Sequence, residues 1–348
     1  MKYPIVHHKP LFLAALIAGL SGCASNQEAF AQHCDKSTQT CSWDVPPGNY
    51  RVALTLNPTA DRLQIFAESR RLMLDMPKVT RKHHHQQLTV NVREPEGQPL
   101  QPFQKSSSTG IPGLNFTWIG NPDAVESAEI KKIVANTQLF IIGDSTVCDQ
   151  NPQWDSPPEE RFSGWGQMIP RYFDQNLAVI NYADSGESSV SFKVDGALWS
   201  TIDSNSQPDD WMFIQLGHND KKTSAEAYRA NISAMIQTAQ KKQVNVVLIS
   251  PMIRNVNAPL DDQHIYGDLQ VRHELSRLAA TYDVPLINLM DLSDKWVQAQ
   301  GQNSAQQYFV KRDRTHTNER GAAVFADMIV KDIQRQHIAI SEFLKSTR

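Results

Sequence analysis

Three side chains of the kind that cleave esters and amides are spread over this 348-residue chain. Ser145 belongs to a GDST sequence that follows an apolar run at residues 138–142. Asp313 and His316 belong to a DRTHTN sequence near the C-terminus. A serine hydroxyl attacks a carbonyl carbon when an imidazole removes its proton and an acid fixes the imidazole tautomer. If the fold brings these three side chains together, they supply the parts of such a reaction.

Acyl transfer also needs hydrogen-bond donors that face the negatively charged oxygen of its intermediate. Two more segments follow apolar runs and contain glycine or amide residues, which supply such donors. ADSGESS contains Gly186, and GHND contains His218 and Asn219. Asp, Gly and Ser also end ordinary strands in turns, so no single segment is enough to indicate a site.

The second part of the chain, residues 136–348, alternates apolar strands with helices, which predicts a doubly wound parallel sheet. The predicted strands are residues 138–142, 178–182, 211–216, 244–249 and 284–289. One predicted helix begins with a capping box of Thr223 and Glu226, and a last helix begins near Asn318. The apolar face of the first consists of Tyr228, Ile232, Met235, Ile236 and Ala239. Such sheets bind ligands at the carboxyl ends of their strands, where GDST, ADSGESS and GHND all lie.

The first part of the chain has a different pattern. Residues 1–22 are interpreted as a targeting signal, residues 23–42 as a polar tether, and residues 43–130 as a small β-sandwich-like domain. Apolar and polar residues alternate at residues 50–56 and 88–92, as they do in half-buried strands. The sequence therefore predicts a β-sandwich-like domain followed by an α/β domain.

The N-terminus resembles a bacterial lipoprotein signal. Lys2 and Lys9 form a basic segment before a short apolar run at residues 11–20. The small-residue box LSGC follows and ends at Cys23. The resemblance implies that Cys23 is lipidated and becomes the new N-terminus. Ala24 after it implies the outer membrane, with the protein facing the periplasm. A plain secretory signal, in which Cys23 has no special role, is the alternative.

Export implies an oxidising compartment, in which disulfides persist. Cys34 and Cys41 lie close together in sequence and are predicted to form a disulfide. Cys148 is then unpaired, and we expect a buried small residue rather than a reactive thiol. The formal charge is −3 at pH 7, and no block of Lys or Arg is long enough to follow a phosphate backbone. Nucleic acid is therefore not expected as a partner, and we expect a monomer.

Together, the four segments resemble the GDSL, or SGNH, hydrolase family, which is named for its Ser, Gly, Asn and His residues. The resemblance covers residues 136–335 and depends on the order in which the segments occur. GDST in place of GDSL, the SGWGQ sequence at residues 163–167 and the TN after DRTH are similar to the branch of rhamnogalacturonan and pectin acetylesterases. The resemblance implies a three-layer α/β/α, flavodoxin-like fold.

The resemblance also implies a role for each site residue. Ser145 would be the nucleophile, His316 the base, and Asp313 the acid that orients the base. The backbone N–H groups of Ser145 and Gly186 and the side-chain amide of Asn219 would form the oxyanion hole. No metal or cofactor is implied.

The resemblance to that branch implies acetylated pectic polysaccharide or oligogalacturonides as the substrate, cleaved through an acetyl-enzyme intermediate. Pectin is a polyanion, so a chain of negative net charge needs local cations to bind it. The cations near the four segments are Lys193, Arg254, Lys311, Arg312 and Arg314. Further candidates for sugar contact are His218, Trp165 and Trp199. The alternatives are surface solubility for the cations, core packing for Trp165 and loop support for His218.

Other classes of function fit the sequence less well. A lipase or thioesterase of the same superfamily is the main alternative, although the sequence has no long apolar lid. The GxSxG elbow of α/β-hydrolases is excluded because Val147 takes the place of its second glycine. A metallophosphoesterase would need an Asp at that position, and we read the histidines at residues 83–85 as a solvated loop. An inactive polysaccharide-binding module is disfavoured because Ser145, Asp313 and His316 are all present.

Overall fold

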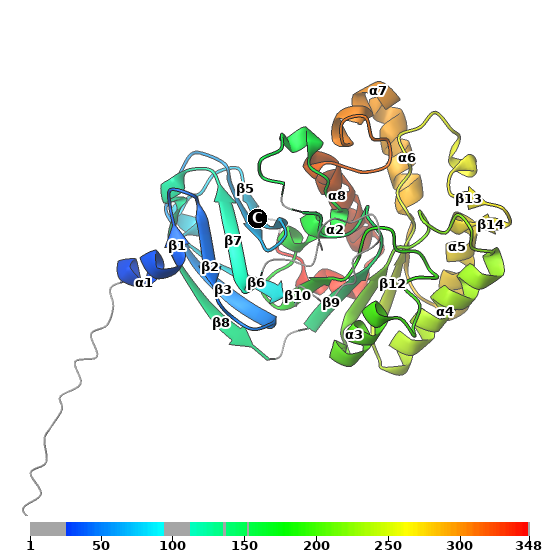
Figure 1. The fold of residues 1–348 in the computed structure, drawn as a ribbon, viewed down its shortest axis with the longest axis horizontal. Coiled ribbons are helices and arrows are strands. Elements are labelled where there is room, and N and C mark those ends of the chain that lie inside the picture. The colour runs from blue at the N-terminus through cyan, green and yellow to red at the C-terminus, as the bar shows by residue number, and fades with distance from the viewer. Residues whose placement is uncertain (1–25, 94–111, 135–136, 152, 347–348) are drawn as a thin grey trace, which may run out of the picture.

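The computed structural model describes residues 26–93, 112–134, 137–151 and 153–346. Within these ranges the chain forms two units that lie side by side (Figure 1). The β unit contains the described residues up to 133, and the α/β unit contains those from 137 onward. No helix in the described ranges has the length and apolar character needed to cross a membrane.

The β unit consists of two antiparallel sheets with a shared apolar core, as predicted for a sandwich. The first sheet contains, in spatial order, β1 (Cys34–Asp35), β2 (Thr40–Trp43), β7 (Leu114–Ile119), β4 (Leu63–Ala67) and β5 (Arg71–Met76). The second contains β6 (His85–Val92), β3 (Gly48–Leu56) and β8 (Val125–Ile133). Every second residue of β3 from Tyr50 to Leu56 is buried in the core. This alternation is what a strand with one covered face requires.

The tether predicted at residues 23–42 is wrong for the described part of that segment. Its residues form α1 (Asn26–His33) and the hairpin of β1 and β2, which a disulfide between Cys34 and Cys41 closes. The segment is polar in composition, but one of its few apolar residues, Phe30, is buried in the core of the β unit and holds the segment in place. β2 also pairs with β7, so the hairpin extends the first sheet.

Five parallel strands form the central sheet of the α/β unit. Their spatial order is β10 (Leu177–Asn181), β9 (Thr137–Ile142), β11 (Trp211–Ile214), β12 (Asn245–Ile249) and β15 (Leu286–Ile287). Each strand lies within or beside one of the five predicted apolar runs, and the predicted parallel sheet is confirmed. The order of the strands is that of flavodoxin-like sheets, in which the chain changes direction across the sheet once.

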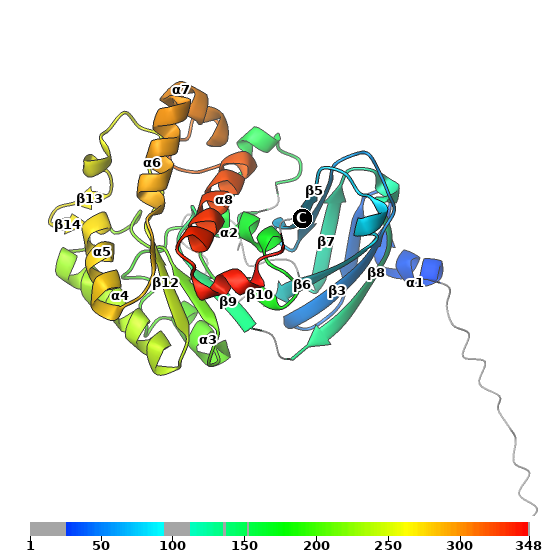
Figure 2. The same cartoon turned by 180° about the vertical axis from the view of Figure 1, so that it is seen from behind.

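Helices cover both faces of this sheet and complete the predicted three layers. On one face, α3 (Ala197–Asn205) and α4 (Ala225–Lys241) lie in front of the sheet in Figure 1. α5 (Val271–Tyr282) packs in the same apolar cluster as these two helices. The opposite face, in front in Figure 2, carries α2 (Trp165–Met168), α6 (Leu289–Gln300) and α8 (Glu319–Arg335). The remaining short elements are α7 (Gln302–Ala305), β13 (Ile265–Tyr266) and β14 (Leu269–Gln270). Because both faces are covered, the strands are mostly apolar.

The apolar face predicted for α4 is buried, but its predicted capping box is wrong. The N-cap is Ser224, whose hydroxyl accepts the N–H of Ala227 at 3.2 Å. Thr223 is held instead by Asp220, which its side chain contacts. Two neighbouring residues with hydroxyl groups both suit an N-cap, and the contact with Asp220 decides between them.

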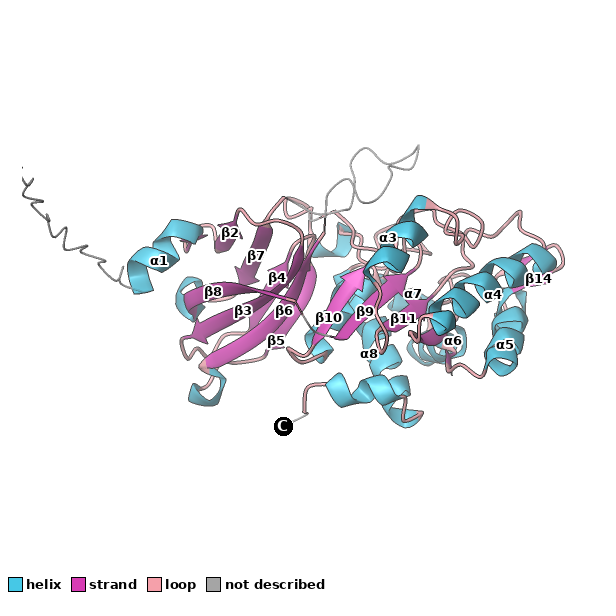
Figure 3. Ribbon diagram, turned by 90° about the horizontal axis from the view of Figure 1, so that it is seen from below, coloured by secondary structure: helices cyan, strands magenta, loops and turns pink. Residues whose placement is uncertain are grey.

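The β unit and the α/β unit are joined along a continuous interface. β6 lies beside β10 at the edge of the central sheet (Figure 3). Phe66 and Leu72 of the β unit belong to the same apolar core as residues of β9, β11 and α8. The two units therefore share a buried core.

Candidate active site

The structure brings Ser145 and His316 together at the carboxyl end of the central sheet. Ser145 follows β9, and its hydroxyl oxygen lies 2.9 Å from Nε2 of His316. On the other side of the imidazole ring, Nδ1 lies 2.8 Å from Oδ2 of Asp313. All three residues are half-buried, so each is partly exposed to solvent. A hydroxyl, an imidazole and a carboxylate in this order can activate a serine as a nucleophile.

A turn before α8 explains how Asp313 faces a histidine only three positions later. Oδ1 of Asp313 accepts the backbone N–H groups of Thr315 at 2.7 Å and His316 at 2.9 Å. The N–H of Val310 donates to the carbonyl oxygen of His316 and closes the loop. α8 then begins next to Asn318, as predicted, and Asn318 caps it with its side-chain oxygen. These bonds leave Oδ2 directed at the imidazole.

Asp313 keeps its negative charge down to low pH. Partial burial raises the pKa of its carboxyl group. Hydrogen bonds from His316 and Thr315 more than offset this effect and lower the pKa to about 2. The carboxylate is therefore ionised at neutral pH. It can stabilise the imidazolium that forms when His316 accepts a proton.

The three predicted oxyanion donors follow three neighbouring strands. Ser145 follows β9, Gly186 follows β10, and Asn219 follows β11. Within the described part of the chain, the backbone N–H groups of Ser145 and Gly186 donate to no protein acceptor. The side-chain amide of Asn219 donates to the carbonyl oxygen of Glu187 at 3.0 Å, which leaves its second N–H for a ligand. The site thus has donors of the kind that an oxyanion needs.

Buried and half-buried polar side chains fix the loop that carries Ser145. Oδ1 of Asp144 accepts the N–H and the hydroxyl of Thr146, while burial raises the pKa of Asp144 to about 6. Nε2 of Gln215 donates to the hydroxyl oxygen of Thr146 at 2.9 Å. Nε2 of Gln150 donates to the carbonyl oxygen of Ser145 itself at 2.8 Å. The sequence did not predict the two glutamines, because a glutamine that supports a loop has no characteristic spacing.

Trp165 and Trp199, which were predicted as sugar contacts, are core residues. Their side chains are 0% and 2% exposed. The indole N–H of Trp165 donates to Oε1 of Gln215 at 2.8 Å, and Trp199 packs between α3 and the central sheet. An indole must expose one face to stack on a sugar ring, so the prediction is wrong for both.

His218 is buried and does not line the surface of the site. Its side chain is 3% exposed, and its ring stands edge-on to that of His264, with 4.4 Å between the ring centres. Burial is the main reason that the pKa of His218 lies well below its ordinary value, and His264 and Arg254 lower it further. The ring is therefore neutral at neutral pH. The predicted sugar contact is wrong, because the ring is buried against His264.

Arg254 lies beside the loop that carries Asn219. Its Nη2 donates to the hydroxyl oxygen of Tyr266 at 3.2 Å and to the carbonyl oxygen of His218 at 3.5 Å. Its side chain is half-buried, and none of the described carboxylates forms an ion pair with it. His218 lies within electrostatic reach of both Arg254 and His316, so the guanidinium belongs to the neighbourhood of the site.

The other predicted cations are exposed. Lys193 forms an ion pair with Asp195 in its own loop, and Lys311 forms one with Glu160. Arg312 and Arg314 flank Asp313 with exposed side chains. Their position beside the site is consistent with substrate contact, and their exposure equally suits a role in solubility.

The cysteines lie outside the predicted chemistry. Cys148, three positions after Ser145, is a free buried thiol, and burial raises its pKa well above the ordinary value. Cys34 and Cys41 form the disulfide of the β unit. Cys23, the predicted lipidation site, lies outside the described residues. In the described ranges no three His, Cys, Asp or Glu side chains are grouped to hold a metal ion.

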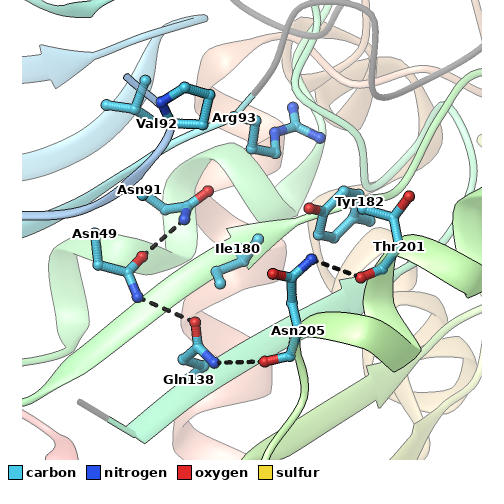
Figure 4. Close-up of a pocket in the computed structure, with 11 residues that line it drawn as sticks. Asn49, Asn91, Val92, Arg93, Gln138, Ile180, Tyr182, Thr201 and Asn205 are labelled. Carbon is cyan, nitrogen blue, oxygen red and sulfur yellow. Dashed lines mark hydrogen bonds between the residues drawn. The ribbon is translucent and has the colours of Figure 1, made fainter. Parts of the chain in front are cut away.

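A cavity with a mixed polar and apolar lining lies at the junction of the two units and apart from the site (Figure 4). Its volume is about 380 Å³, and its lining includes Asn49, Asn91, Gln138, Thr201 and Asn205. Amide side chains bond to one another across the junction, Asn91 to Asn49 at 2.7 Å and Asn49 to Gln138 at 3.0 Å. Ser145, Asp313 and His316 do not line this cavity, so it belongs to the interface between the units.

Comparison with known proteins agrees with this arrangement. Residues 141–324, which contain all four segments, match the GDSL-like Lipase/Acylhydrolase family. The chain is 28% identical over 328 residues to an uncharacterized esterase, YxiM, of Bacillus subtilis strain 168, which covers 92% of this chain and 80% of that protein. It is 27% identical over 230 residues to the rhamnogalacturonan acetylesterase RhgT of the same organism, with 60% and 94% covered.

Two further comparisons agree. A probable rhamnogalacturonan acetylesterase, YesY, of Bacillus subtilis strain 168 is 29% identical over 225 residues, which cover 60% of this chain and 98% of that protein. The crystal structure of YxiM from Bacillus subtilis matches with a TM-score of 0.54 at 26% identity and covers 86% of this chain and 81% of that one. The family match spans more than half of the chain, and the named relatives are esterases. The chain is therefore a carboxylic ester hydrolase that belongs to the GDSL-like lipase/acylhydrolase family.

Proposed function

We propose that this protein is a serine esterase that removes O-acetyl groups from pectic polysaccharides or oligogalacturonides. The observation that carries the proposal is the hydrogen-bonded chain from Ser145 through His316 to Asp313. Two relatives named as rhamnogalacturonan acetylesterases, at 27% and 29% identity, support the choice of an acetyl group on a pectic sugar.

The reaction begins with His316 as the general base. Its Nε2 removes the hydroxyl proton of Ser145 while the serine oxygen attacks the acetyl carbonyl carbon. The carbonyl oxygen becomes an oxyanion and accepts hydrogen bonds from the N–H groups of Ser145 and Gly186 and the amide of Asn219. His316 then gives its proton to the sugar oxygen as the ester bond breaks, and the acetyl group stays on Ser145.

Water completes the cycle by the same steps. His316 removes a proton from the water, whose oxygen attacks the acetyl carbon of the acetyl-enzyme. The intermediate collapses, the proton returns to the serine oxygen, and acetate leaves. Asp313 stays ionised throughout and keeps the imidazole in the tautomer that both steps need.

Arg254 supports a uronate-containing substrate. A half-buried guanidinium with no carboxylate partner among the described residues is a suitable donor for a carboxylate of the ligand. It is anchored to the carbonyl oxygen of His218, which directly precedes Asn219. A galacturonate carboxylate next to the acetylated hydroxyl would supply the missing anion.

Acetate release from three substrates tests the proposed function. The protein should release acetate from acetylated oligogalacturonides faster than from acetylated xylan, and should cleave p-nitrophenyl palmitate poorly. Arg254→Ala should raise KM for the oligogalacturonides by about ten-fold, the usual effect of losing one charged hydrogen bond. It should leave the rate of p-nitrophenyl acetate hydrolysis unchanged. The control Arg277→Ala, at an exposed arginine of α5, should leave both this rate and KM for the oligogalacturonides unchanged. A preference for the palmitate ester would overturn the carbohydrate assignment and favour a lipase.

We also propose that the protein is exported, lipidated on Cys23, anchored to the outer membrane and monomeric. The support for the anchor is the sequence of residues 1–23. Radioactive palmitate fed to producing cells should label the wild-type protein and not Cys23→Ser. An unlabelled wild-type protein would rule out the anchor. Sedimentation of the solubilised protein should give the mass of a single chain, and a larger mass would contradict the monomer.

A further inference from the structure

We infer that the β unit is part of the catalytic apparatus. The hairpin tip, residues 68–71, consists of the turn between β4 and β5 and the first residue of β5. It positions the loops that carry Ser145 and His316. Arg71 and Asp149 are positioning residues in this arrangement. The inference rests on the proposed roles of Ser145 and His316, and it assigns a role to a unit that is otherwise expected to be a separate module.

The hairpin tip is buried, although loops between strands normally lie at the surface. Glu68, Ser69, Arg70 and Arg71 are 6%, 3%, 0% and 1% exposed. Glu68 and Arg70 also have φ values of 54° and 59°, in the left-handed region that residues other than glycine rarely adopt. Such a conformation persists only where the surroundings enforce it, and it is concentrated at functional sites. The surroundings of this tip include Asn115 and Asn91 of the β unit and, on its other side, loops of the α/β unit.

A first path of hydrogen bonds leads from the tip to the nucleophile. The carbonyl oxygen of Ser69 accepts from Nε2 of Gln167 at 2.5 Å. The same nitrogen donates to the carbonyl oxygen of Gln150 at 3.2 Å, and the side chain of Gln150 donates to the carbonyl oxygen of Ser145 at 2.8 Å. Two side-chain amides thus connect the backbone of the β unit to the backbone of Ser145.

A second path is a buried group of charges. Nε of Arg71 and Nη2 of Arg93 lie 2.9 Å and 3.3 Å from Oδ2 of Asp149, and all three side chains are at most 3% exposed. The other carboxylate oxygen accepts from Nδ2 of Asn181 at 2.9 Å, and that amide also donates to the carbonyl oxygen of Val147. Two arginines of the β unit therefore fix the segment that directly follows Ser145.

A third path leads to the base. Nη1 of Arg70 lies 2.6 Å from Oε1 of Glu319, the first residue of α8 and three positions after His316. Nη2 of Arg70 donates to the carbonyl oxygen of Phe162. The ring of Phe162 in turn stands edge-on to the His316 imidazole, with 5.5 Å between the ring centres. The tip thus contacts the supports of both members of the Ser145–His316 pair.

The three paths imply a positioning role because they converge on two loops that must keep a fixed separation. A shift of about 1 Å between nucleophile and base lowers a rate by about 100-fold. A sugar-binding module that acts separately from the catalytic unit would not need Arg70 and Arg71 buried against these loops, because buried charges require close partners. The catalytic rate per competent site should therefore depend on contacts made by the β unit.

Active-site titration separates positioning from folding. Diethyl p-nitrophenyl phosphate releases one p-nitrophenolate for each reactive serine, so its burst counts the competent sites and its time course gives the rate at which Ser145 reacts. We predict that Arg71→Lys and Asp149→Asn lower both this rate constant and kcat per titrated site on p-nitrophenyl acetate by about ten-fold or more. Arg62→Lys is the matched control, because Arg62 lies in the β unit and pairs with Asp75 but is exposed.

Gln150→Ala keeps the inference testable if the charge variants fail to fold. Gln150 is half-buried, and its loss removes only the last hydrogen bond of the first path. This variant should also react more slowly per site while the number of sites stays the same. Rates per site within two-fold of wild type, with only fewer sites or a lower Tm, would overturn the inference. A wild-type protein that gives no burst would instead contradict the proposed role of Ser145.

Discussion

At the scale of single residues, the reaction depends on the direction in which His316 points. Asp313 sets this direction, because its Oδ2 lies 2.8 Å from Nδ1 while two backbone N–H groups hold its Oδ1. In Asp313→Asn an amide N–H can face Nδ1 and favour the wrong tautomer, so kcat on p-nitrophenyl acetate should fall by about 10⁴. Asp262→Asn, at an exposed carboxylate, should leave kcat unchanged. A loss below about ten-fold would be inconsistent with a base oriented by Asp313.

The second prediction at this scale concerns the oxyanion. Asn219 donates one N–H to Glu187 and keeps the other for the substrate oxygen. Asn219→Ala should lower kcat by roughly 10²–10³, the usual effect of removing one donor from an oxyanion hole. KM should change much less, because the donor acts mainly on the transition state. Steady-state kinetics on p-nitrophenyl acetate measure both constants, with the exposed Asn257→Ala as the control. An effect confined to KM would argue against this role.

The residues of the chemistry were predictable from the sequence, whereas several of their neighbours were not. Ser145, Gly186 and Asn219 each follow an apolar strand, and the structure shows that these three strands are neighbours in the sheet. Trp165 and Trp199 were misjudged, because the exposure of an indole depends on how distant elements pack around it. The same reason applies to support by Gln150, which depends on the path of a loop.

At the scale of elements, apolar strands were easier to predict than strands with buried charges. The parallel strands of the α/β unit are apolar runs covered on both faces, which the sequence displays directly. β5 begins with Arg71, a buried arginine, and β8 has few buried residues, so neither shows a clear alternation. The placement of the hairpin tip between loops of the other unit was likewise not predictable, since its partners in that unit, such as Asp149, Gln167 and Glu319, are more than seventy positions away along the chain.

The hairpin tip also contains a carboxyl group with a raised pKa. Burial is the largest cause and raises the pKa of Glu68 from 4.5 to about 7, although Arg71 and the N–H of Asn115 oppose it. Between these values the folded protein holds a proton that the unfolded chain has released. The contribution of Glu68 to stability is therefore complete below pH 4.5 and is lost as the pH rises to about 7. The difference between the two pKa values corresponds to about 3 kcal/mol in the free energy of unfolding.

Glu68→Gln should remove this pH dependence. The amide can still accept the hydrogen bond from Asn115 but does not titrate. Urea unfolding between about pH 5 and pH 7 should therefore show a smaller loss of stability in the variant than in wild type. Glu126→Gln, at an exposed carboxylate of β8, is the control and should follow the wild type. Equal pH dependence in wild type and Glu68→Gln would refute the assignment.

At the scale of the whole molecule, the two units are expected to unfold together. Phe66 and Leu72 of the β unit share a core with α8, and buried ion pairs cross the interface. Calorimetry should show one unfolding transition for the wild-type protein. Phe66→Ala should lower the free energy of unfolding by about 3–5 kcal/mol and should still show a single transition. The exposed Val190→Ala is the control. Two separate transitions in the wild-type protein would mean that the units fold independently.

The central claim is that Ser145 carries the acetyl group during the reaction. Rapid quenching of the protein with p-nitrophenyl acetate, followed by peptide mass spectrometry, should find an acetylated peptide. Fragmentation should place the acetyl group on Ser145 and not on Cys148, which lies three positions further along. Ser145→Ala should show neither the modified peptide nor acetate release. Full activity in Ser145→Ala, or an acetyl group on another residue that forms and decays at the catalytic rate, would contradict the account.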